Sequence, residues 1–276
     1  MRPRILLLDG DPTVHELLSY LLGRGDRQLH DVYDGREGIE CLRQTSFDVV
    51  FAGQGRNGLG AMDFLRRARA ICPAARIIVT GESDPADVLR AIRHRAYAYL
   101  PKPLPPGTVT EITQFALEAS EWQDDIRLLS ARPEWISLDV RSKLDAAERT
   151  ICFVRELEAD LAPQKRDDVM AAFRELLLNA VEHGAKSDAS KRVRVSLMRT
   201  ARSLIVQIQD PGPGFSMDVL PHAAISNPEN APIRHVEVRA EQGQRPGGFG
   251  ILMARNLVDD LIYNERGNGV LFVKDL

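Results

Sequence analysis

The first hundred residues alternate between short hydrophobic runs and amphipathic stretches with helical spacing. The hydrophobic runs predict strands at 4–9, 47–52, 76–80 and 97–100. The amphipathic stretches predict helices at 14–22, 62–70 and 85–93. This alternation is typical of α/β proteins with a doubly wound parallel sheet, in which the chemistry lies at the carboxyl ends of the strands.

The second half of the chain has a different order of elements. Its predicted strands are 135–140 and 204–209, followed by a terminal hairpin through 267–269. Its predicted helices are 142–161, 166–184 and 251–260. Residues 215–246 have almost no periodicity, and a loop of that length inside a compact domain is usually functional.

Apolar residues at helical spacing continue between the two halves, from 108 to 129 and through Trp122. They predict that the last helix of the first half runs on until the Arg132–Pro133 step. We therefore expect domains at 1–120 and 135–276, joined by a helical linker at 121–134. The extension either covers the first sheet or pairs with a second copy in a homodimer.

The predicted helix 166–184 carries the first polar motif. Glu175, Asn179 and Glu182 share one face, away from an apolar stripe that includes Phe173 and Leu176. An amide oxygen can ligate Mg²⁺, and a carboxylate one turn away can polarise a nucleophile. Polar helix faces are usually only solvated, so this motif alone does not decide the function.

Two glycine-containing motifs follow. Asp210, at the end of the strand 204–209, precedes Gly212 and Gly214, which allow a sharp turn near a flat ligand. A carboxylate there can accept a hydrogen bond from an exocyclic amine such as that of adenine. The run 247–250, which contains Gly248 and Gly250, opens an apolar helix whose free N–H groups could hold a phosphate. Three such motifs in this order predict an ATP pocket.

With these motifs, residues from about 135 to 276 resemble the ATPase domain shared by histidine kinases, gyrase-type ATPases and anti-sigma-factor serine kinases. The resemblance implies an α+β sandwich that binds ATP and Mg²⁺. It also implies that Asn179 binds Mg²⁺, that Asp210 binds adenine, and that 215–246 is a lid. The implied ATP-binding residues are Asn179, Asp210, Gly212, Gly214, Gly248 and Gly250.

The segment before this domain distinguishes the branches of the family. Histidine kinases have a donor histidine on a helical hairpin there, but residues 111–161 contain no histidine. The layout instead resembles that of the anti-sigma serine kinases, which place a glutamate at the position of Glu175. That resemblance implies that Glu175 is the catalytic base towards a substrate hydroxyl.

The first half is similar to the receiver domain of two-component response regulators. That family has two acids, a phosphoacceptor Asp, a Thr or Ser, and a Lys at the ends of the strands. Asp9, Thr80 and Lys102 match this pattern, as does the aromatic Tyr99. Without an acceptor, Thr80 and Lys102 are most simply packing and hydrogen-bonding residues.

Two positions depart from the receiver pattern. Gly10 stands where the second acid should be, with Asp11 one step further on. The acceptor position falls on Gly53, or on Ala52 if the frame is shifted, and neither can form an acyl phosphate. We therefore interpret the domain as a degenerate receiver with weakened Mg²⁺ binding.

Composition is consistent with a signalling protein. The 276 residues carry a net charge of −3, which gives no electrostatic reason to expect a nucleic-acid or membrane partner. Three scattered cysteines without metal-ligand spacing indicate a reducing, cytoplasmic environment. No apolar stretch is long enough to cross a bilayer.

These features predict a receiver-like domain that regulates an ATP-dependent serine/threonine kinase domain acting on a small antagonist protein. Two alternatives remain open. The protein could be an ATP-gated binding module that sequesters a partner such as a sigma factor, or a histidine-kinase-like component of a phosphorelay.

Overall fold

The structure of the protein is a computed structural model that describes residues 2–23, 26–56, 58–118, 125–132, 134–215 and 249–276. The chain divides into two compact units, residues 1–124 with 152–159 and residues 125–151 with 160–276. Each unit is described separately. The predicted lid at 215–246 lies almost wholly outside the described residues, as does Gly248.

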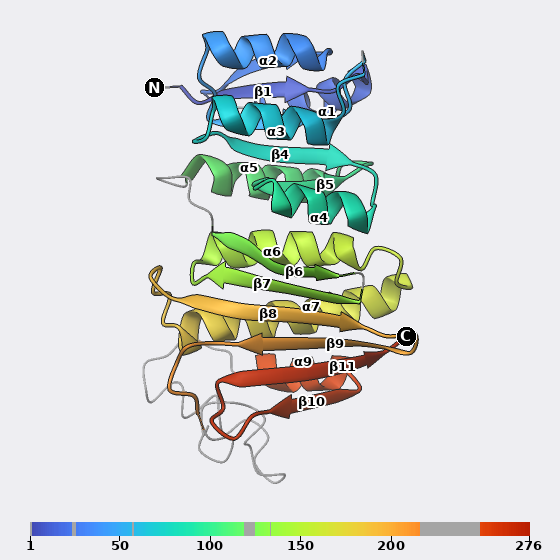
Figure 1. Ribbon diagram of the computed structural model, residues 1–276, viewed down its shortest axis with the longest axis vertical. Coiled ribbons are helices and arrows are strands. Elements are labelled where there is room, and N and C mark those ends of the chain that lie inside the picture. The colour runs from blue at the N-terminus through green and yellow to red at the C-terminus, as the bar shows by residue number, and fades with distance from the viewer. Residues whose placement is uncertain (1, 24–25, 57, 119–124, 133, 216–248) are drawn as a thin grey trace. The chain divides into compact units, whose positions relative to one another are not determined.

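The first unit contains a five-stranded parallel sheet in the order β2-β1-β3-β4-β5 (Figure 1). Its strands are β1 (Arg4–Leu8), β2 (Gln28–Val32), β3 (Val49–Ala52), β4 (Arg76–Gly81) and β5 (Ala98–Pro101). The doubly wound parallel sheet predicted from the sequence is confirmed. The central strands are buried on both faces, which explains why they read as continuous hydrophobic runs.

Five helices accompany this sheet: α1 (Pro12–Leu22), α2 (Gly35–Gln44), α3 (Ala61–Ile71), α4 (Pro85–Arg93) and α5 (Pro106–Glu118). Three of them begin at an aspartate whose side chain accepts hydrogen bonds from the first turn, namely Asp11, Asp34 and Asp84. Helices α1 and α5 pack against a cluster that includes Leu7 and Phe51.

Two elements of this unit were not predicted from the sequence. Strand β2 is an edge strand and α2 follows it directly. Polar residues such as His30 and Asp31 interrupt β2, and most of its positions are at least partly exposed. An edge strand of this kind lacks the hydrophobic run that marks the central strands.

The second unit contains a six-stranded antiparallel sheet in the order β10-β11-β9-β8-β7-β6. Its strands are β6 (Ile126–Arg132), β7 (Trp135–Arg141), β8 (Arg192–Arg199), β9 (Ser203–Gln209), β10 (Asp260–Tyr263) and β11 (Gly269–Asp275). Its helices are α7 (Pro163–Asn179), α9 (Gly250–Leu257) and the first part of α6 (Leu144–Leu157), whose residues from Cys152 on are grouped with the first unit. Figure 1 shows these helices on one face of the sheet, a two-layer α+β arrangement.

The predicted helical linker at 121–134 is wrong for residues 126–132, which form β6. This strand pairs antiparallel with β7, so the second sheet begins at Ile126 rather than near Trp135. Ile126 and Leu128 continue the preceding helical pattern, but they also have the two-residue spacing of a strand. Short apolar segments of this kind can be either helix or strand. Trp122 lies outside the described residues.

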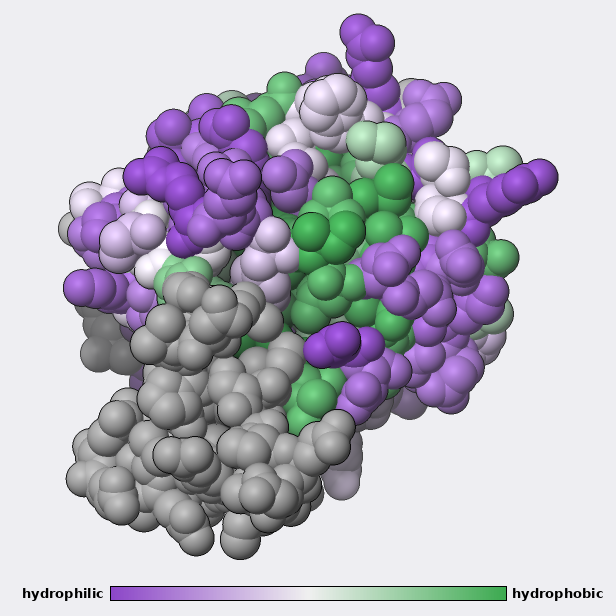
Figure 2. Space-filling view, turned by 90° about the horizontal axis from the view of Figure 1, so that it is seen from below, coloured by the Kyte–Doolittle hydropathy of each residue, from purple (hydrophilic) through white to green (hydrophobic). Residues whose placement is uncertain are grey.

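The β10 end of the second unit exposes apolar side chains (Figure 2). Met253 of α9 is 40% exposed and Ile262 of β10 is 59% exposed.

Among the described residues, no helix is both long and apolar enough to span a membrane.

Candidate functional site

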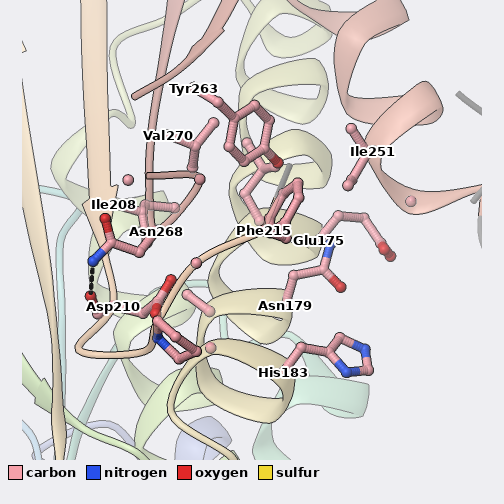
Figure 3. A pocket seen from close by; sticks show the side chains of 18 of the residues that line it. Glu175, Asn179, His183, Ile208, Asp210, Phe215, Ile251, Tyr263, Asn268 and Val270 are labelled. Carbon is pink, nitrogen blue, oxygen red and sulfur yellow. Dashed lines mark hydrogen bonds between the residues drawn. The ribbon is translucent and has the colours of Figure 1, made fainter. Parts of the chain in front are cut away.

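A cavity of about 350 Å³ lies in the second unit, between α7, the inner face of the sheet and the first turn of α9 (Figure 3). It is lined by five of the residues that the motifs predicted: Glu175, Asn179, Asp210, Gly214 and Gly250. These residues are up to 75 positions apart in the sequence. The fold therefore brings residues of all three motifs to one cavity, whereas Gly212 is not among the lining residues.

Helix α7 supplies Glu175 and Asn179. The opposite side of the helix is anchored by buried apolar residues that include Phe173 and Leu177. Glu175 and Asn179 are one turn apart and both are half-buried at the cavity wall. Neither side chain has a hydrogen bond or ion pair to another residue in the described part of the chain. Both are therefore available to a ligand.

The helix ends in a wider π-helical turn, Ala180–Gly184. Glu182 lies in this turn and is exposed outside the cavity, so its predicted alignment with Glu175 and Asn179 is wrong. The wider turn changes the angular spacing that the prediction assumed, and such turns are frequent at functional sites. His183 and Lys186 line the cavity instead. The helical pattern contained no signal for either residue.

Asp210 follows β9 and is fixed by the backbone around it. One carboxylate oxygen accepts a hydrogen bond from the Gly212 N–H at 2.7 Å, and the Asp210 N–H donates to the Asn268 carbonyl at 2.9 Å. The Asn268 amide in turn donates to the carbonyls of Asp210 and Gly212, both at 3.3 Å. The second carboxylate oxygen accepts no hydrogen bond from a described residue. Burial raises the pKa of the Asp210 carboxyl above its ordinary value.

Gly250 begins α9 at the opposite wall. A Cβ at this position would lie so close to the Glu175 carboxylate that this side chain would have to move. Among the described residues, no side chain caps the first turn of α9, and the N–H groups at the start of a helix can receive an anion.

The polar groups of the cavity also fit a magnesium–nucleotide complex. No group of three or more His, Cys, Asp or Glu side chains in the described ranges could hold a metal ion alone. Mg²⁺ in nucleotide sites is usually held by one or two protein groups together with the phosphates. The Asn179 amide and the Glu175 carboxylate can provide those groups.

A second polar group lies at the carboxyl ends of the parallel strands. Asp9 is almost fully buried after β1, and its carboxylate contacts the Lys102 ammonium at 2.6 Å. Its other oxygen accepts the Asp11 N–H at 3.0 Å. Thr80, at the end of β4, is also buried. The structure therefore brings together the three matching residues Asp9, Thr80 and Lys102.

Gly53 lies between Asp9 and Thr80. A Cβ added to Gly53 would collide with the Asp9 carboxylate and would lie 2.9 Å from the Thr80 hydroxyl oxygen. Of the two alternatives for the acceptor position, Gly53 is therefore the one beside these residues, whereas Ala52 is the last residue of β3. Asp11 is exposed and caps α1, because its side chain accepts hydrogen bonds from the backbone and hydroxyl of Thr13.

Comparison with known families identifies both units. Residues 5–114 match the family described as response regulator receiver domain, and residues 140–274 match the histidine kinase-like ATPase domain. The chain is a receiver domain followed by a histidine kinase-like ATPase domain. The second family implies ATP binding, and the combination places the protein in signal transduction.

Individual relatives match parts of the chain. Response regulator protein PilR of Pseudomonas aeruginosa is 29% identical over 140 residues, which cover 48% of this chain and 31% of PilR. Signal transduction histidine-protein kinase AfsQ2 of Streptomyces coelicolor is 27% identical over 221 residues, which cover 72% of this chain and 35% of AfsQ2. The chain thus spans about a third of the length of these two relatives.

Solved structures also resemble the receiver domain. The signal receiver domain of an HD domain-containing protein from Pseudomonas fluorescens Pf-5 is 26% identical, with a TM-score of 0.41. The match covers 43% of this chain and 96% of that one.

Proposed function

We propose that the ATPase domain phosphorylates a serine or threonine of a small antagonist-type protein. The observation that carries this proposal is the pair formed by Glu175 and Asn179. The two side chains line one cavity with Asp210, and neither is bonded to another described residue. A carboxylate in this position can take a proton from a substrate hydroxyl.

Each residue has one role in the proposed reaction. Glu175 accepts the proton as the substrate hydroxyl oxygen bonds to the terminal phosphorus of ATP, and the bond to the bridging oxygen breaks to release ADP. Asp210 accepts a hydrogen bond from the adenine amine. Asn179 would hold Mg²⁺, which when bound neutralises charge on the phosphates.

Serine or threonine is favoured over histidine as acceptor because residues 111–161 contain no histidine. The test uses the full chain with Mg²⁺ and ATP labelled on its terminal phosphate, together with proteins captured from the native host in the presence of an ATP analogue. We expect the label on a captured partner as an acid-stable phosphoester. An acid-labile phosphoprotein would instead support a phosphorelay. ATP binding without transfer to any partner would support the ATP-gated binding module.

We also propose that the receiver domain is not phosphorylated at its acceptor position and regulates the ATPase domain without that chemistry. Gly53 beside Asp9 and Thr80 supports this proposal, because glycine offers no carboxylate. Treatment of the protein with a small-molecule phosphodonor should leave it unmodified in intact-mass spectrometry. A phosphoaspartate at Asp9, Asp11 or Asp48 would contradict this proposal and would mean that the acceptor had moved.

A further inference from the structure

The floor of the ATP cavity is a row of three residues across neighbouring strands. Ile208 of β9 pairs with Val270 of β11, and Val270 pairs with Tyr263 of β10. All three line the cavity (Figure 3). Neighbouring strands lie about 4.8 Å apart, so Tyr263 is roughly 9 to 10 Å from Ile208. The cavity floor therefore has Asp210 close to one end and Tyr263 at the other.

Tyr263 presents a hydroxyl group to this cavity. Its ring packs edge-on against Phe215, with 5.2 Å between ring centroids, and its hydroxyl points into the pocket (Figure 3). Within the described ranges this hydroxyl makes no hydrogen bond. Burial, reinforced by the negative charge of Asp210, raises the pKa of Tyr263, so the group keeps its proton and can donate it. A largely buried tyrosine hydroxyl usually has a hydrogen-bond partner, and a ligand in the cavity can be that partner.

We propose that Tyr263 donates a hydrogen bond to a ribose hydroxyl of the bound nucleotide. The inference rests on the proposed role of Asp210 as the adenine contact. In adenosine the exocyclic amine and the sugar are attached at opposite ends of the base. An adenine whose amine contacts Asp210 would lie over Ile208 and Val270. The base is shorter than the row of three residues, so it does not extend to Tyr263. The sugar is then the part of the nucleotide that reaches Tyr263.

The position of the phosphate-binding groups is consistent with this direction. Glu175 and Asn179 lie on the α7 side of the cavity and Gly250 lies on the α9 side, whereas Asp210 follows β9. A nucleotide that leaves Asp210 along the floor passes Tyr263 before its phosphates reach the first turn of α9. Tyr263 would therefore discriminate against a nucleotide that lacks the contacted ribose hydroxyl.

The test compares the wild type with Tyr263→Phe, which keeps the ring and its contact with Phe215. Calorimetry would measure the affinity of the full chain for ATP, 2′-deoxy-ATP and 3′-deoxy-ATP. We expect the wild type to bind one deoxy analogue about 3- to 10-fold more weakly than ATP, the effect of one neutral hydrogen bond. Tyr263→Phe should weaken ATP binding by the same factor and leave binding of that analogue unchanged.

Tyr20→Phe is the matched control, because Tyr20 is 66% exposed on α1 of the receiver domain. It should change none of the three affinities, and thermal unfolding of both variants would verify that they fold. If Tyr263→Phe lowered the affinity for all three nucleotides equally, the proposal would be contradicted. Tyr263 would then only line the cavity without a hydrogen bond to the ribose. Unchanged ATP affinity, or a wild type that does not discriminate among the three, would also overturn it.

Failure of the ribose contact can be distinguished from failure of the ATP site. If ATP binding still depends on Asp210 while Tyr263→Phe has no effect, only the ribose contact is wrong. If the wild type does not bind ATP at all, both proposals fail.

Discussion

The two polar sites of this protein differ in whether their charged and polar side chains have partners within the fold. In the receiver domain, Asp9 is paired with Lys102 and hydrogen-bonded to Asp11, so its carboxylate has partners within the fold. In the ATPase domain, Glu175 and Asn179 have no such partners among the described residues, and one oxygen of Asp210 accepts no hydrogen bond.

The difference indicates which pocket is adapted to a ligand. A buried polar group without a partner destabilises the folded state, so unpaired groups in a pocket are expected mainly where a ligand completes them. Within the described residues, the Asp9 carboxylate has the Lys102 ammonium and the Asp11 N–H as partners. Glu175 and Asn179 have none there, which is consistent with a cavity that receives a polar ligand.

The largest expected effect is on the rate of phosphotransfer, and it comes from Glu175, the proposed general base. Glu175→Gln keeps the size of the side chain but cannot accept a proton, so phosphotransfer should slow by roughly 10²- to 10⁴-fold with little change in ATP affinity. Single-turnover transfer and calorimetry would measure the two quantities separately. Glu182→Gln, on the same segment but outside the cavity, should leave both unchanged. Transfer at the wild-type rate by Glu175→Gln would rule out the general-base role.

Asn179→Ala refines this test. It should weaken Mg²⁺-dependent nucleotide binding as well as transfer, because the proposed metal ligand is lost. If it slowed transfer and left binding unchanged, the assignment of Mg²⁺ to Asn179 would be contradicted.

The next effect concerns the stability of the receiver domain. Lys102→Met leaves the Asp9 carboxylate buried without its cation, which should lower the free energy of unfolding by about 3 kcal/mol, near the low end for buried pairs because Lys102 is 24% exposed. Hydrogen exchange in peptides from β1 and β5 would report this loss. Adding Asp9→Asn should restore most of it by removing the charge. If Lys102→Met alone left exchange unchanged, the pocket would not depend on its internal ion pair.

A smaller effect is expected at the adenine end of the ATPase pocket. Asp210→Asn removes a charge-assisted hydrogen bond and should weaken ATP binding by roughly 1.5 to 3 kcal/mol. Calorimetry measures this directly, with Asp260→Asn as a control because Asp260 is exposed at the start of β10. Equal ATP affinity in Asp210→Asn and the wild type would remove Asp210 from the site.

The smallest effect is the pH dependence of the same group. Because burial raises the pKa of Asp210, it takes up a proton at a higher pH than an exposed aspartate does. On acidification, ATP affinity should therefore fall as the carboxylate is neutralised. The free energy of unfolding contributed by this group should rise over the same range, because the folded state binds this proton more tightly than the unfolded state. Asp210→Asn should lack both changes, and a wild-type pH profile that matches the variant would contradict this prediction.

The sequence predicts the parts of the molecule in which local pattern and tertiary role agree. The central strands of the receiver sheet are buried on both faces and read as hydrophobic runs, so they were identified. Strand β2 was missed because an edge strand carries polar residues. The helix predicted through 126–132 failed because the pairing of β6 with β7 outweighs a weak helical spacing.

The same reasoning applies to the candidate site. Glu175, Asn179 and Asp210 could be identified because each belongs to a short motif with a recognisable order. Tyr263 and Asn268 belong to no such motif, and they reach the cavity only through the register of β9, β10 and β11. A contact that depends on strand register over some 60 residues leaves no local signal in the sequence.

The close packing of Gly53 against Asp9 also bears on the evolution of this receiver. A new carboxylate at position 53 would collide with the Asp9 side chain, so the substitution that restores an acceptor is expected to destabilise the domain when it occurs alone. A side chain at position 53 would require the Asp9 carboxylate to move from its present place. Because Asp9 is also the partner of Lys102, that movement would disturb their ion pair, so we expect the residues at positions 9, 53 and 102 to change together.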